Sequence, residues 1–259
     1  MLNELTLFGE TDKVKIAIER LKTFEPDEGY YLAFSGGKDS VVIKALADMA
    51  GVKYDAHYNL TTIDPPELVQ FIKRVHPDVE IHRPPKPFLK KLVEWGYPQR
   101  QYRWCCNYLK ESFGAGLVIT GVRWAESAKR KANRKMIDTY YKGGKKQMLN
   151  VIIDWTTAEV WQFIRGLGIP YCELYDQGWD RIGCLFCPNA YYKQRLRHAA
   201  LYPKYVSNFI KAFQKLYDKK ISDGKGHQVE KWENGEQMFW AWLRGNPKRT
   251  NDDQVQIFD

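Results

Sequence analysis

The chain has 259 residues, an apolar fraction of 44% and a formal net charge of +9. With 14% aromatic residues it has enough apolar material for a buried core, which excludes a predominantly disordered protein. The positive charge is informative about binding partners and not about the fold. Polyanions, nucleotides and acidic surfaces are all compatible with it as partners.

The first ten residues have neither the basic nor the apolar segment of a secretory signal. No stretch approaches the roughly 18 apolar residues that a membrane span needs. We therefore expect a cytoplasmic protein without membrane association. Disulfides are uncommon in that compartment, so the clustered ones among its five cysteines are expected to bind metal or take part in catalysis.

Strand and helix patterns alternate along most of the chain. Such alternation predicts an α/β fold, with a parallel sheet and right-handed crossovers. In chain order, the expected elements are a helix over Asp12–Leu21, a strand over Tyr30–Phe34, a helix over Val41–Met49, a strand over Tyr54–Tyr58, a helix over Pro65–Val75, a strand over Val79–His82, helices over Phe88–Trp95 and Trp104–Ser112, strands over Leu117–Thr120 and Asn150–Ile153, and a helix to about Gly166 with Thr156 or Thr157 as its N-cap and Glu159 in its first turn.

From Asn189 onward the pattern is helical and rich in aromatic residues. We expect a helical C-terminal layer on the same sheet, ending in a polar tail over Lys248–Asp259. This divides the chain into an α/β domain over residues 1–188 and a helical extension over residues 189–259 that packs on it.

The segment Ser35–Ser40 reads SGGKDS and lies between a predicted strand and a predicted helix. Glycines let the backbone approach a ligand, successive amides can converge on an anion, and the following helix adds its positive N-terminal end. Lys38 can neutralise phosphate charge, and the serines can donate hydrogen bonds. The context predicts a phosphate-binding loop rather than a simple tight turn, although it is not the Gly-x4-Gly-Lys-Ser/Thr loop.

Four of the five cysteines form two pairs, Cys105 with Cys106 and Cys184 with Cys187. Four thiolates suit a [4Fe–4S] cluster or tetrahedral zinc. Adjacent cysteines diverge on a helix and span a wide site, which favours a cluster, with zinc and a redox disulfide as alternatives. Cys172 lies outside this set and is expected to be a structural thiol.

The loop and the cysteine pairs together resemble the phosphoadenosine phosphosulfate (PAPS) reductase family, within the wider PP-loop ATP-pyrophosphatase superfamily. The resemblance runs from about Tyr30 to Pro188 and implies a Rossmann-like parallel sheet flanked by helices, the PP-loop fold. Besides the loop, it rests on Ile119–Arg123 with Glu126, Ser127 and Arg130, on Ile153–Thr156 with Val160 and Trp161, on Gly168–Tyr171, and on Leu174–Gly178 leading into Ile182–Cys187.

The resemblance also implies roles for residues. Members of the adenosine-phosphosulfate type hold a [4Fe–4S] cluster on Cys-Cys and Cys-x-x-Cys pairs, which implies the metal ligands Cys105, Cys106, Cys184 and Cys187. Arg123 is expected to face the anionic end of the substrate. The implied catalytic residues are Lys38, Asp39 and Arg123, and the implied nucleotide-binding residues are Ser35, Gly36, Gly37, Lys38, Asp39, Ser40, Asn59, Thr61, Gly121, Arg123 and Arg130.

Two departures from the reductases shift the expected activity. Those enzymes attack the sulfonucleotide with a cysteine in a C-terminal Glu-Cys-Gly segment, and here no cysteine follows Cys187. The intact SGGKDS loop instead resembles the ATP-using branch of the superfamily. We therefore expect an enzyme that cleaves ATP to AMP and pyrophosphate with Mg²⁺ and activates or transfers sulfur. Related members carry out DNA phosphorothioation and tRNA thiolation.

Two alternatives stay open. One is a PAPS or adenosine-phosphosulfate reductase that releases sulfite, with Cys172 or a partner thiol as nucleophile. The other is a non-catalytic regulator that binds nucleotide or nucleic acid. A sulfur-donor protein and a second copy of the chain are further candidate partners. No general base is evident, and the five histidines, His57, His76, His82, His198 and His227, form no recognisable catalytic pair.

The segment Arg123–Lys146 holds nine basic and two acidic residues, so it carries most of the net charge. Trp124, Tyr140 and Tyr141 are interleaved with the basic residues. Basic and aromatic side chains together suit a nucleic-acid backbone and its bases. The simpler interpretation is a solvated loop that balances the phosphates of a nucleotide.

Overall fold

The computed structural model describes residues 2–6, 9–111, 114, 116–139 and 146–245. It opens with an antiparallel hairpin of β1 (Asn3–Thr6) and β2 (Gly9–Asp12), which the sequence patterns do not predict. The predicted first helix follows as α1 (Lys13–Thr23), where the Asp12 carboxylate caps the amide of Val14 at 2.9 Å. The expected polar tail over Lys248–Asp259 lies outside the described residues.

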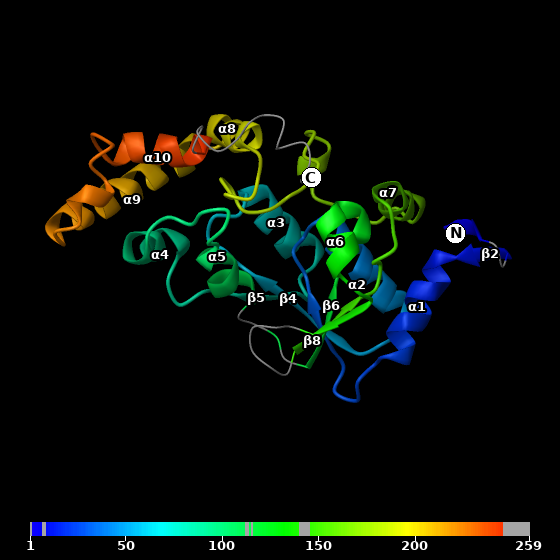
Figure 1. Cartoon of the computed structure of the whole chain (residues 1–259). Helices are drawn as coiled ribbons and strands as arrows, with labels where there is room; N and C mark the ends of the chain where they lie inside the picture. The colour runs from blue at the N-terminus through cyan, green and yellow to red at the C-terminus, as the bar shows by residue number, and fades with distance from the viewer. Residues whose placement is uncertain (1, 7–8, 112–113, 115, 140–145, 246–259) are drawn as a thin grey trace.

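A six-stranded sheet forms the centre of the molecule (Figure 1). Its order is β5-β4-β3-β6-β8-β7, and all neighbours run parallel except β7, which is antiparallel to β8. The predicted α/β class with a mainly parallel sheet is confirmed. The strands are β3 (Tyr30–Ala33), β4 (Tyr54–Asn59), β5 (Glu80–His82), β6 (Gly116–Thr120), β7 (Ile137–Thr139) and β8 (Lys146–Asn150).

The strand order reverses beside β3. From β3 the chain moves outward to β4 and β5, and it then returns to the other side of β3 with β6. In open α/β sheets ligands bind outside the carboxyl ends of the strands at such a reversal. The segments that leave the sheet there are the predicted phosphate loop after β3 and the Gly121–Arg123 segment after β6.

Helices follow the strands much as the periodicity predicts. On the α1 side, α1, α2 and α7 pack in a row, and Arg20 of α1 holds the Asp154 carboxylate before α7 with two 2.9 Å hydrogen bonds. Thr156 and Glu159 form a capping box at the start of α7, as expected. The helices of this part are α2 (Lys38–Ala50), α3 (Pro66–Val75), α4 (Phe88–Trp95), α6 (Ala128–Asn133) and α7 (Thr157–Gly166).

Two predicted elements differ from the structure. The strand expected over Asn150–Ile153 is wrong, because β8 ends at Asn150 and the next four residues form a turn. The buried Asn150 side chain donates to the Lys135 carbonyl and to Asp138, which fixes the end of the strand.

The helix expected to begin at Trp104 begins there, but it widens after one turn. A short α5 (Trp104–Cys106) continues as a π-helix over Asn107–Glu111. The expected last residue of this helix, Ser112, lies outside the described part. π-Helical turns are rare and often occur at functional sites.

The C-terminal segment is helical, as expected, and consists of α8 (Tyr192–Leu201), α9 (Pro203–Ser222) and α10 (Gly235–Arg244). In Figure 1 these helices lie at the side of the molecule opposite to α1. The expected helical layer is present, but the element against which α9 packs is α4 and not the sheet. Phe88 and Phe209 meet there at 5.7 Å between ring centroids. The division at residue 188 stays a prediction.

No described helix is both long and apolar enough to cross a membrane.

The crossing of α9 and α10 leaves no space for a side chain at Gly235. A Cβ atom there would lie 2.2 Å from the Gln214 backbone, whereas a Cβ at Gly226 would meet nothing within 4 Å. We expect Gly235→Ala to lower the free energy of unfolding by about 2 kcal/mol or more through overpacking. Denaturant unfolding measures this loss of stability. Gly226→Ala is the matched control, because a Cβ atom at that position meets no neighbour. Equal stability of the two variants would contradict this packing.

Candidate functional site

The predicted phosphate loop leads directly into α2. Gly37 is the N-cap residue, and no side chain caps the helix. The hydroxyls of Ser35 and Ser40 lie 3.2 Å apart, and Ser40 also donates to the Gly37 carbonyl at 2.8 Å. The loop therefore presents backbone amides and two hydroxyls at the positive end of a 13-residue helix, an arrangement that suits an anion.

Two glycines let the loop fit against its neighbours. Gly36 has φ +71°, and a Cβ atom there would lie 2.7 Å from Leu68 and 2.8 Å from Ile72. Gly121, at the end of β6, comes so close to α2 that a Cβ would lie 2.9 Å from that of Asp39. Two of the three predicted site glycines, Gly36 and Gly121, are therefore required by close approach, to α3 and to α2 respectively.

Tyr175, which sequence reasoning did not assign to the site, closes one side of the loop. Its hydroxyl accepts a 2.8 Å hydrogen bond from the Lys38 amide, and burial raises its pKa. The Lys38 ammonium lies 3.4 Å from the Asp180 carbonyl and 3.4 Å from the Asp39 carboxylate. Tyr175, Asp180 and Thr157 line part of a cavity of about 240 Å³.

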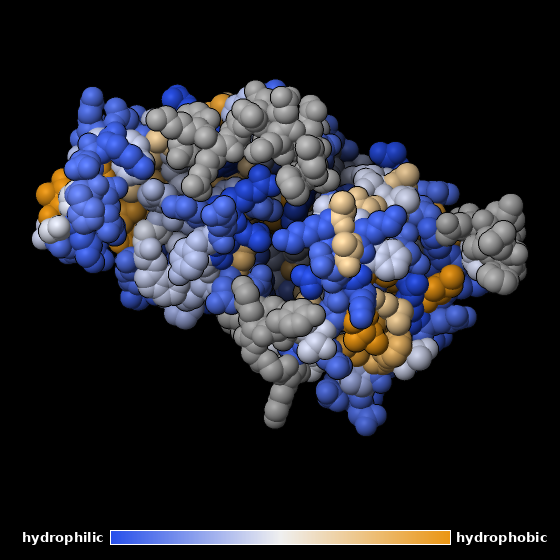
Figure 2. All heavy atoms as spheres, in the orientation of Figure 1, coloured by the Kyte–Doolittle hydropathy of each residue, from blue (hydrophilic) through white to orange (hydrophobic). Residues whose placement is uncertain are grey.

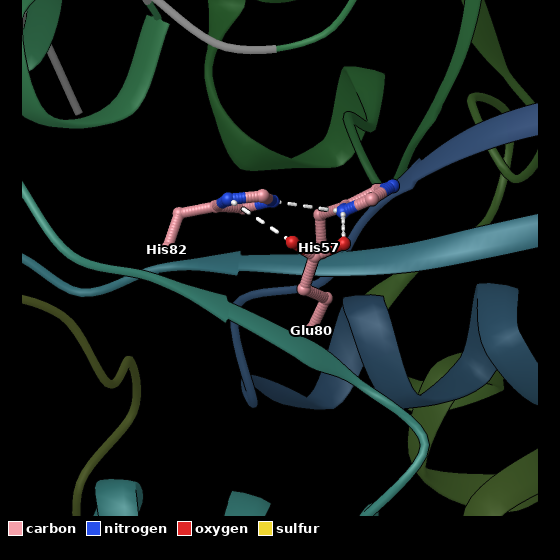
Figure 3. A group of neighbouring side chains, drawn as sticks. All are labelled: His57, Glu80 and His82. Carbon is pink, nitrogen blue, oxygen red and sulfur yellow. Dashed lines mark hydrogen bonds and ion pairs between the residues drawn. The ribbon is translucent and has the colours of Figure 1, made fainter.

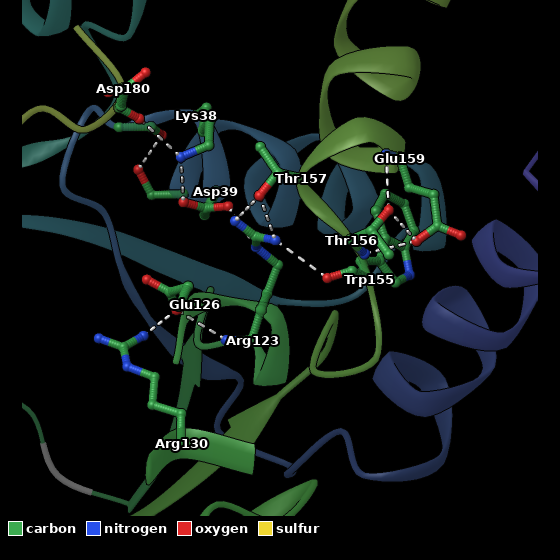
Figure 4. A network of polar contacts seen from close by, with 12 residues as sticks. Lys38, Asp39, Arg123, Glu126, Arg130, Trp155, Thr156, Thr157, Glu159 and Asp180 are labelled. Carbon is green, nitrogen blue, oxygen red and sulfur yellow. Dashed lines mark hydrogen bonds and ion pairs between the residues drawn. The ribbon is translucent and has the colours of Figure 1, made fainter. Parts of the chain in front are cut away.

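Arg123 connects three segments beneath the loop (Figure 4). Its side chain is 1% exposed, and its Nε donates to Asp39 at 2.7 Å. The other guanidinium nitrogens donate to the Trp155 carbonyl at 3.1 Å and to the Thr157 hydroxyl at 3.4 Å. The donors of Arg123 are engaged with the protein in this structure, and its expected contact with the substrate stays a prediction. Arg123 and Asp39 position the loop.

Arg130 is the cation that lies closer to an open face. It pairs with Glu126, whose other contact is the Arg123 amide at 3.0 Å. Burial lowers the pKa of Arg130, Glu126 raises it, and the like charges of Arg181 and Arg134 lower it further. Cations therefore gather beside Asp39 and the loop, and Arg181 is a member that the sequence patterns did not reveal.

Asn59 and Thr61 follow β4, where nucleotide contacts were expected. The Asn59 amide donates to the Lys110 carbonyl at 3.3 Å. Thr61 is 1% exposed and lies beside Cys184, whose pKa is raised by burial while a hydrogen bond from Thr61 opposes this. Its amide donates to the Asp64 carboxylate at 2.7 Å. Thr61 therefore lies at the cysteines, and its expected role in nucleotide binding stays a prediction.

The structure brings the two cysteine pairs together. Cys106, Cys184 and Cys187 all raise the pKa of Cys105, which places the four thiols in one neighbourhood. A hydrogen bond with Cys105 lowers the pKa of Cys106 to about 6, and burial raises that of Cys184 to about 11. All five cysteines are free thiols, so the disulfide alternative is not observed.

Two metal centres suit four thiols in one neighbourhood. Tetrahedral zinc would hold them on one ion, and an iron–sulfur cluster would give each thiolate its own iron.

Two cations accompany the cysteines. Cys184 raises the pKa of Lys110, which follows Cys106 by one turn of the π-helix. Cys187 acts on Arg195 of α8, whose buried Nε has no hydrogen-bond partner within the described structure. Positive charge and an unused donor next to four thiols fit a cluster with four thiolates, because such contacts stabilise sulfur ligands and tune their potential.

The turn between Cys184 and Cys187 is strained and held from both sides. Phe186 is fully buried with φ +57°, a conformation that bulky residues rarely adopt. Its amide donates to Nδ1 of His198 at 3.3 Å, and the Leu185 amide donates to the Ile63 carbonyl at 2.8 Å. Burial lowers the pKa of His198 to about 4, so this histidine is neutral and structural.

Cys172 is fully buried in the core, and burial raises its pKa. A thiol in this state is a poor nucleophile, because the thiolate is the attacking form. The structure thus agrees with the expected structural role.

The basic segment does not present all its charges to solvent. Arg123 is buried, and Arg134 lies 3.6 Å from Asp138. Lys129, Lys131 and Lys135 are exposed. Tyr140, Tyr141, Lys142 and Lys145 lie outside the described residues. Figure 2 shows hydrophilic side chains around a hollow between α5 and α6.

The phosphoadenosine phosphosulfate reductase domain model matches residues 29–190, which contain the loop and all five cysteines. The chain belongs to this family. An adenosine 5'-phosphosulfate reductase of Staphylococcus epidermidis is 33% identical over 211 residues, covering 72% of this chain and 81% of that protein.

Two further relatives and a solved structure also match. An uncharacterized protein of Methanocaldococcus jannaschii is 29% identical over 230 residues, covering 83% of this chain. The chain spans 52% and 35% of the lengths of that protein and of a second one from the same organism. The structure of a PAPS reductase from Candida auris matches with a TM-score of 0.50 at 18% identity, over 65% of this chain and 87% of that one, and supports the fold.

Replacing Arg123 should lower the free energy of unfolding substantially. Arg123→Met leaves the Asp39 carboxylate and the Trp155 carbonyl without their buried partner, and we expect a loss of about 3 kcal/mol in the free energy of unfolding. Arg134→Met, at a pair whose arginine is 40% exposed, should cost under about 1 kcal/mol. Denaturant unfolding compares them. A loss at Arg123 no larger than at Arg134 would contradict the positioning role.

Proposed function

We propose that this member of the PAPS reductase family binds ATP at Ser35–Ser40 and cleaves it between the α and β phosphates. A substrate oxygen would attack the α-phosphorus and pyrophosphate would leave. A sulfide-level sulfur nucleophile from a sulfur donor would then attack the adenylated product and displace AMP. The single observation that carries the proposal is the uncapped N-terminus of α2, with Lys38 and the Arg130–Arg181 cations beside it. This much positive charge suits a polyphosphate better than one phosphate group.

In this proposal, each residue has a distinct part. The amides at the start of α2 and the Lys38 ammonium stabilise the charge that develops on the leaving pyrophosphate. The Tyr175 hydroxyl accepts from the Lys38 amide, so its own proton is available for donation to a phosphate oxygen. Asp39 and Arg123 hold the loop in position. Mg²⁺, when bound, supplies further charge neutralisation on the phosphates.

We further propose that Cys105, Cys106, Cys184 and Cys187 hold a [4Fe–4S] cluster. Lys110 and Arg195 offset part of its negative charge, and Thr61 donates to one ligand. The cluster, when bound, supplies redox-active iron and sulfide close to the loop after β4. Asp64 joins this loop to the C-terminal helices, because its carbonyl accepts a 3.1 Å hydrogen bond from the Tyr205 hydroxyl.

Sulfonucleotide reduction is the second candidate, and the relationship to the Staphylococcus epidermidis reductase favours it. This reaction needs a thiolate that attacks sulfur. Cys172 is buried, and the other four cysteines form the proposed cluster site. The nucleophile would therefore come from outside the printed sequence, and sulfite would be the product.

The exposed lysines of α6 and its flank also offer a nucleic-acid contact, as an acceptor such as DNA or tRNA would require. Lys129, Lys131 and Lys135 are candidates, whereas Arg123 is not, because it is buried. Each phosphate contact that these residues make would contribute about one unit to the salt dependence of binding.

Turnover by anaerobic, cluster-loaded protein distinguishes the two reactions. With ATP and Mg²⁺ we expect AMP and pyrophosphate in the presence of a suitable acceptor, and Lys38→Ala should lower the rate roughly 100-fold or more. Lys73→Ala, an exposed lysine on α3, is the matched control and should leave the rate unchanged.

The products decide between the candidates. Sulfite from a sulfonucleotide and a thiol reductant, without pyrophosphate from ATP, would replace the first candidate with the second. Nucleotide affinity that survives Lys38→Ala, with no turnover of either substrate, would overturn both and support a regulator.

The cluster has its own test. After anaerobic reconstitution we expect about four iron and four sulfide per chain. Cys184→Ser should lose most of the iron and the visible absorption, whereas Cys172→Ala should keep both because that thiol lies outside the site. Equal iron content in the two variants would contradict the assignment.

A further inference from the structure

Three side chains without a role in the nucleotide or cysteine sites meet at the edge of the sheet. His57 comes from β4, and Glu80 and His82 come from β5 (Figure 3). One donor atom from each lies within 4.8 Å of the other two, and no other group of three or more metal-binding side chains in the described residues meets that limit. Sequence reasoning found no partner for either histidine.

The backbone explains why they meet. In the parallel pairing of β4 and β5, His57 is aligned with Glu80, and Asn59 is aligned with His82. Side chains two residues apart on a strand point to the same face of the sheet. His82 and Glu80 therefore share the face on which His57 lies, and the hydrogen-bonded ladder fixes all three.

The distances suit ligands of one ion. His57 Nδ1 and His82 Nε2 are 2.8 Å apart, and a Glu80 oxygen is 3.4 Å from the same His57 atom. One donor atom from each of the three residues lies within 4.8 Å of the other two. Ligands of a tetrahedral zinc ion at 2.0–2.2 Å are separated by roughly 3.3 to 3.6 Å. Small side-chain rotations that move the two imidazoles apart and bring the carboxylate closer would therefore place all three donors on one ion.

The surroundings hold one histidine in place and leave the site accessible to ions. The Tyr31 ring stacks on His57 at 4.1 Å and holds the imidazole in place. The His57 and His82 side chains are 13% and 23% exposed, whereas Glu80 is 65% exposed. The site is thus closed on the histidine side and open to ions on the carboxylate side.

We propose that His57, Glu80 and His82 bind a divalent first-row transition-metal ion, with zinc preferred. Two imidazoles and one carboxylate suit zinc, copper, nickel or iron(II), whereas magnesium and calcium take oxygen ligands. Three protein ligands leave at least one position for water.

The bound ion would act on the fold. It would join the three-residue edge strand β5 to β4, whose last residue leads into the loop beside the cysteines. We therefore assign it a stabilising role at the sheet edge. The inference is independent of the proposed function, since neither the phosphate loop nor the cysteines take part.

Cobalt titration of the full, cluster-loaded chain tests this site. We expect one equivalent of Co²⁺ to bind with the visible spectrum of nitrogen and oxygen ligands and without a thiolate charge-transfer band. Zn²⁺ should displace it, measured by calorimetry, and should raise the melting temperature. The spectrum separates this site from residual binding at the cysteines.

Variants make the test specific. The double variant His57→Gln with His82→Gln should weaken zinc binding more than about 100-fold, since loss of even a ligand's hydrogen-bond partner costs 10–100-fold. Glu80→Gln removes only an exposed charge, so it should fold normally while binding more weakly and losing the zinc-dependent rise in melting temperature. His227→Gln, at an exposed histidine elsewhere, is the matched control.

Two results would overturn the proposal. One is zinc affinity unchanged in both Glu80→Gln and the double variant. The other is no ion bound below millimolar Zn²⁺ by the wild-type chain, which would leave His57 and His82 as a simple hydrogen-bonded pair. Either result would leave the nucleotide assays unaffected.

Discussion

The buried ion pair of Arg123 and Asp39 holds the proposed nucleotide site together. Asp39 is the second residue of α2, and Arg123 follows β6, so the pair joins the two segments that leave the sheet where the strand order reverses. Gly121 permits the approach, because any larger residue would collide with Asp39. Arg123 also reaches Trp155 and Thr157 at the start of α7. The position of the loop therefore depends on one guanidinium.

The cysteine site depends on a similar convergence of distant segments. The π-helix after Cys106, the loop after β4 and the strained turn at Phe186 meet, and His198 of α8 holds the last of these. The C-terminal helices are thus part of the support of this site, although they pack on α4 and not on the sheet. Tyr175 and Asp180, on the same chain segment as Cys184, reach Lys38. The cysteine turn and the phosphate loop are therefore mechanically connected.

Much of the fold and of the candidate site was predictable from the sequence, because it depends on local patterns of residues. Alternating strands and helices, the glycines of the loop and the paired cysteines follow from backbone sterics and thiol chemistry. The N-terminal hairpin, β7 and the π-helix were not predictable, because short strands depend on their partners and a π-turn has no periodic signature. The burial of Thr61 and Arg123 was not predictable, because their residue types suit both ligand binding and internal support. Only burial distinguishes these roles.

The sequence by itself determined the family and the α/β class, and it predicted the phosphate loop and the set of four cysteines, since each rests on residue types at fixed spacing. Tertiary structure decided which cations remain near the loop, that Cys172 is buried, and that the two cysteine pairs meet. It also brought His57, Glu80 and His82 together from two strands. These properties depend on distances between segments far apart in the chain, which strand register and helix packing set and local sequence does not.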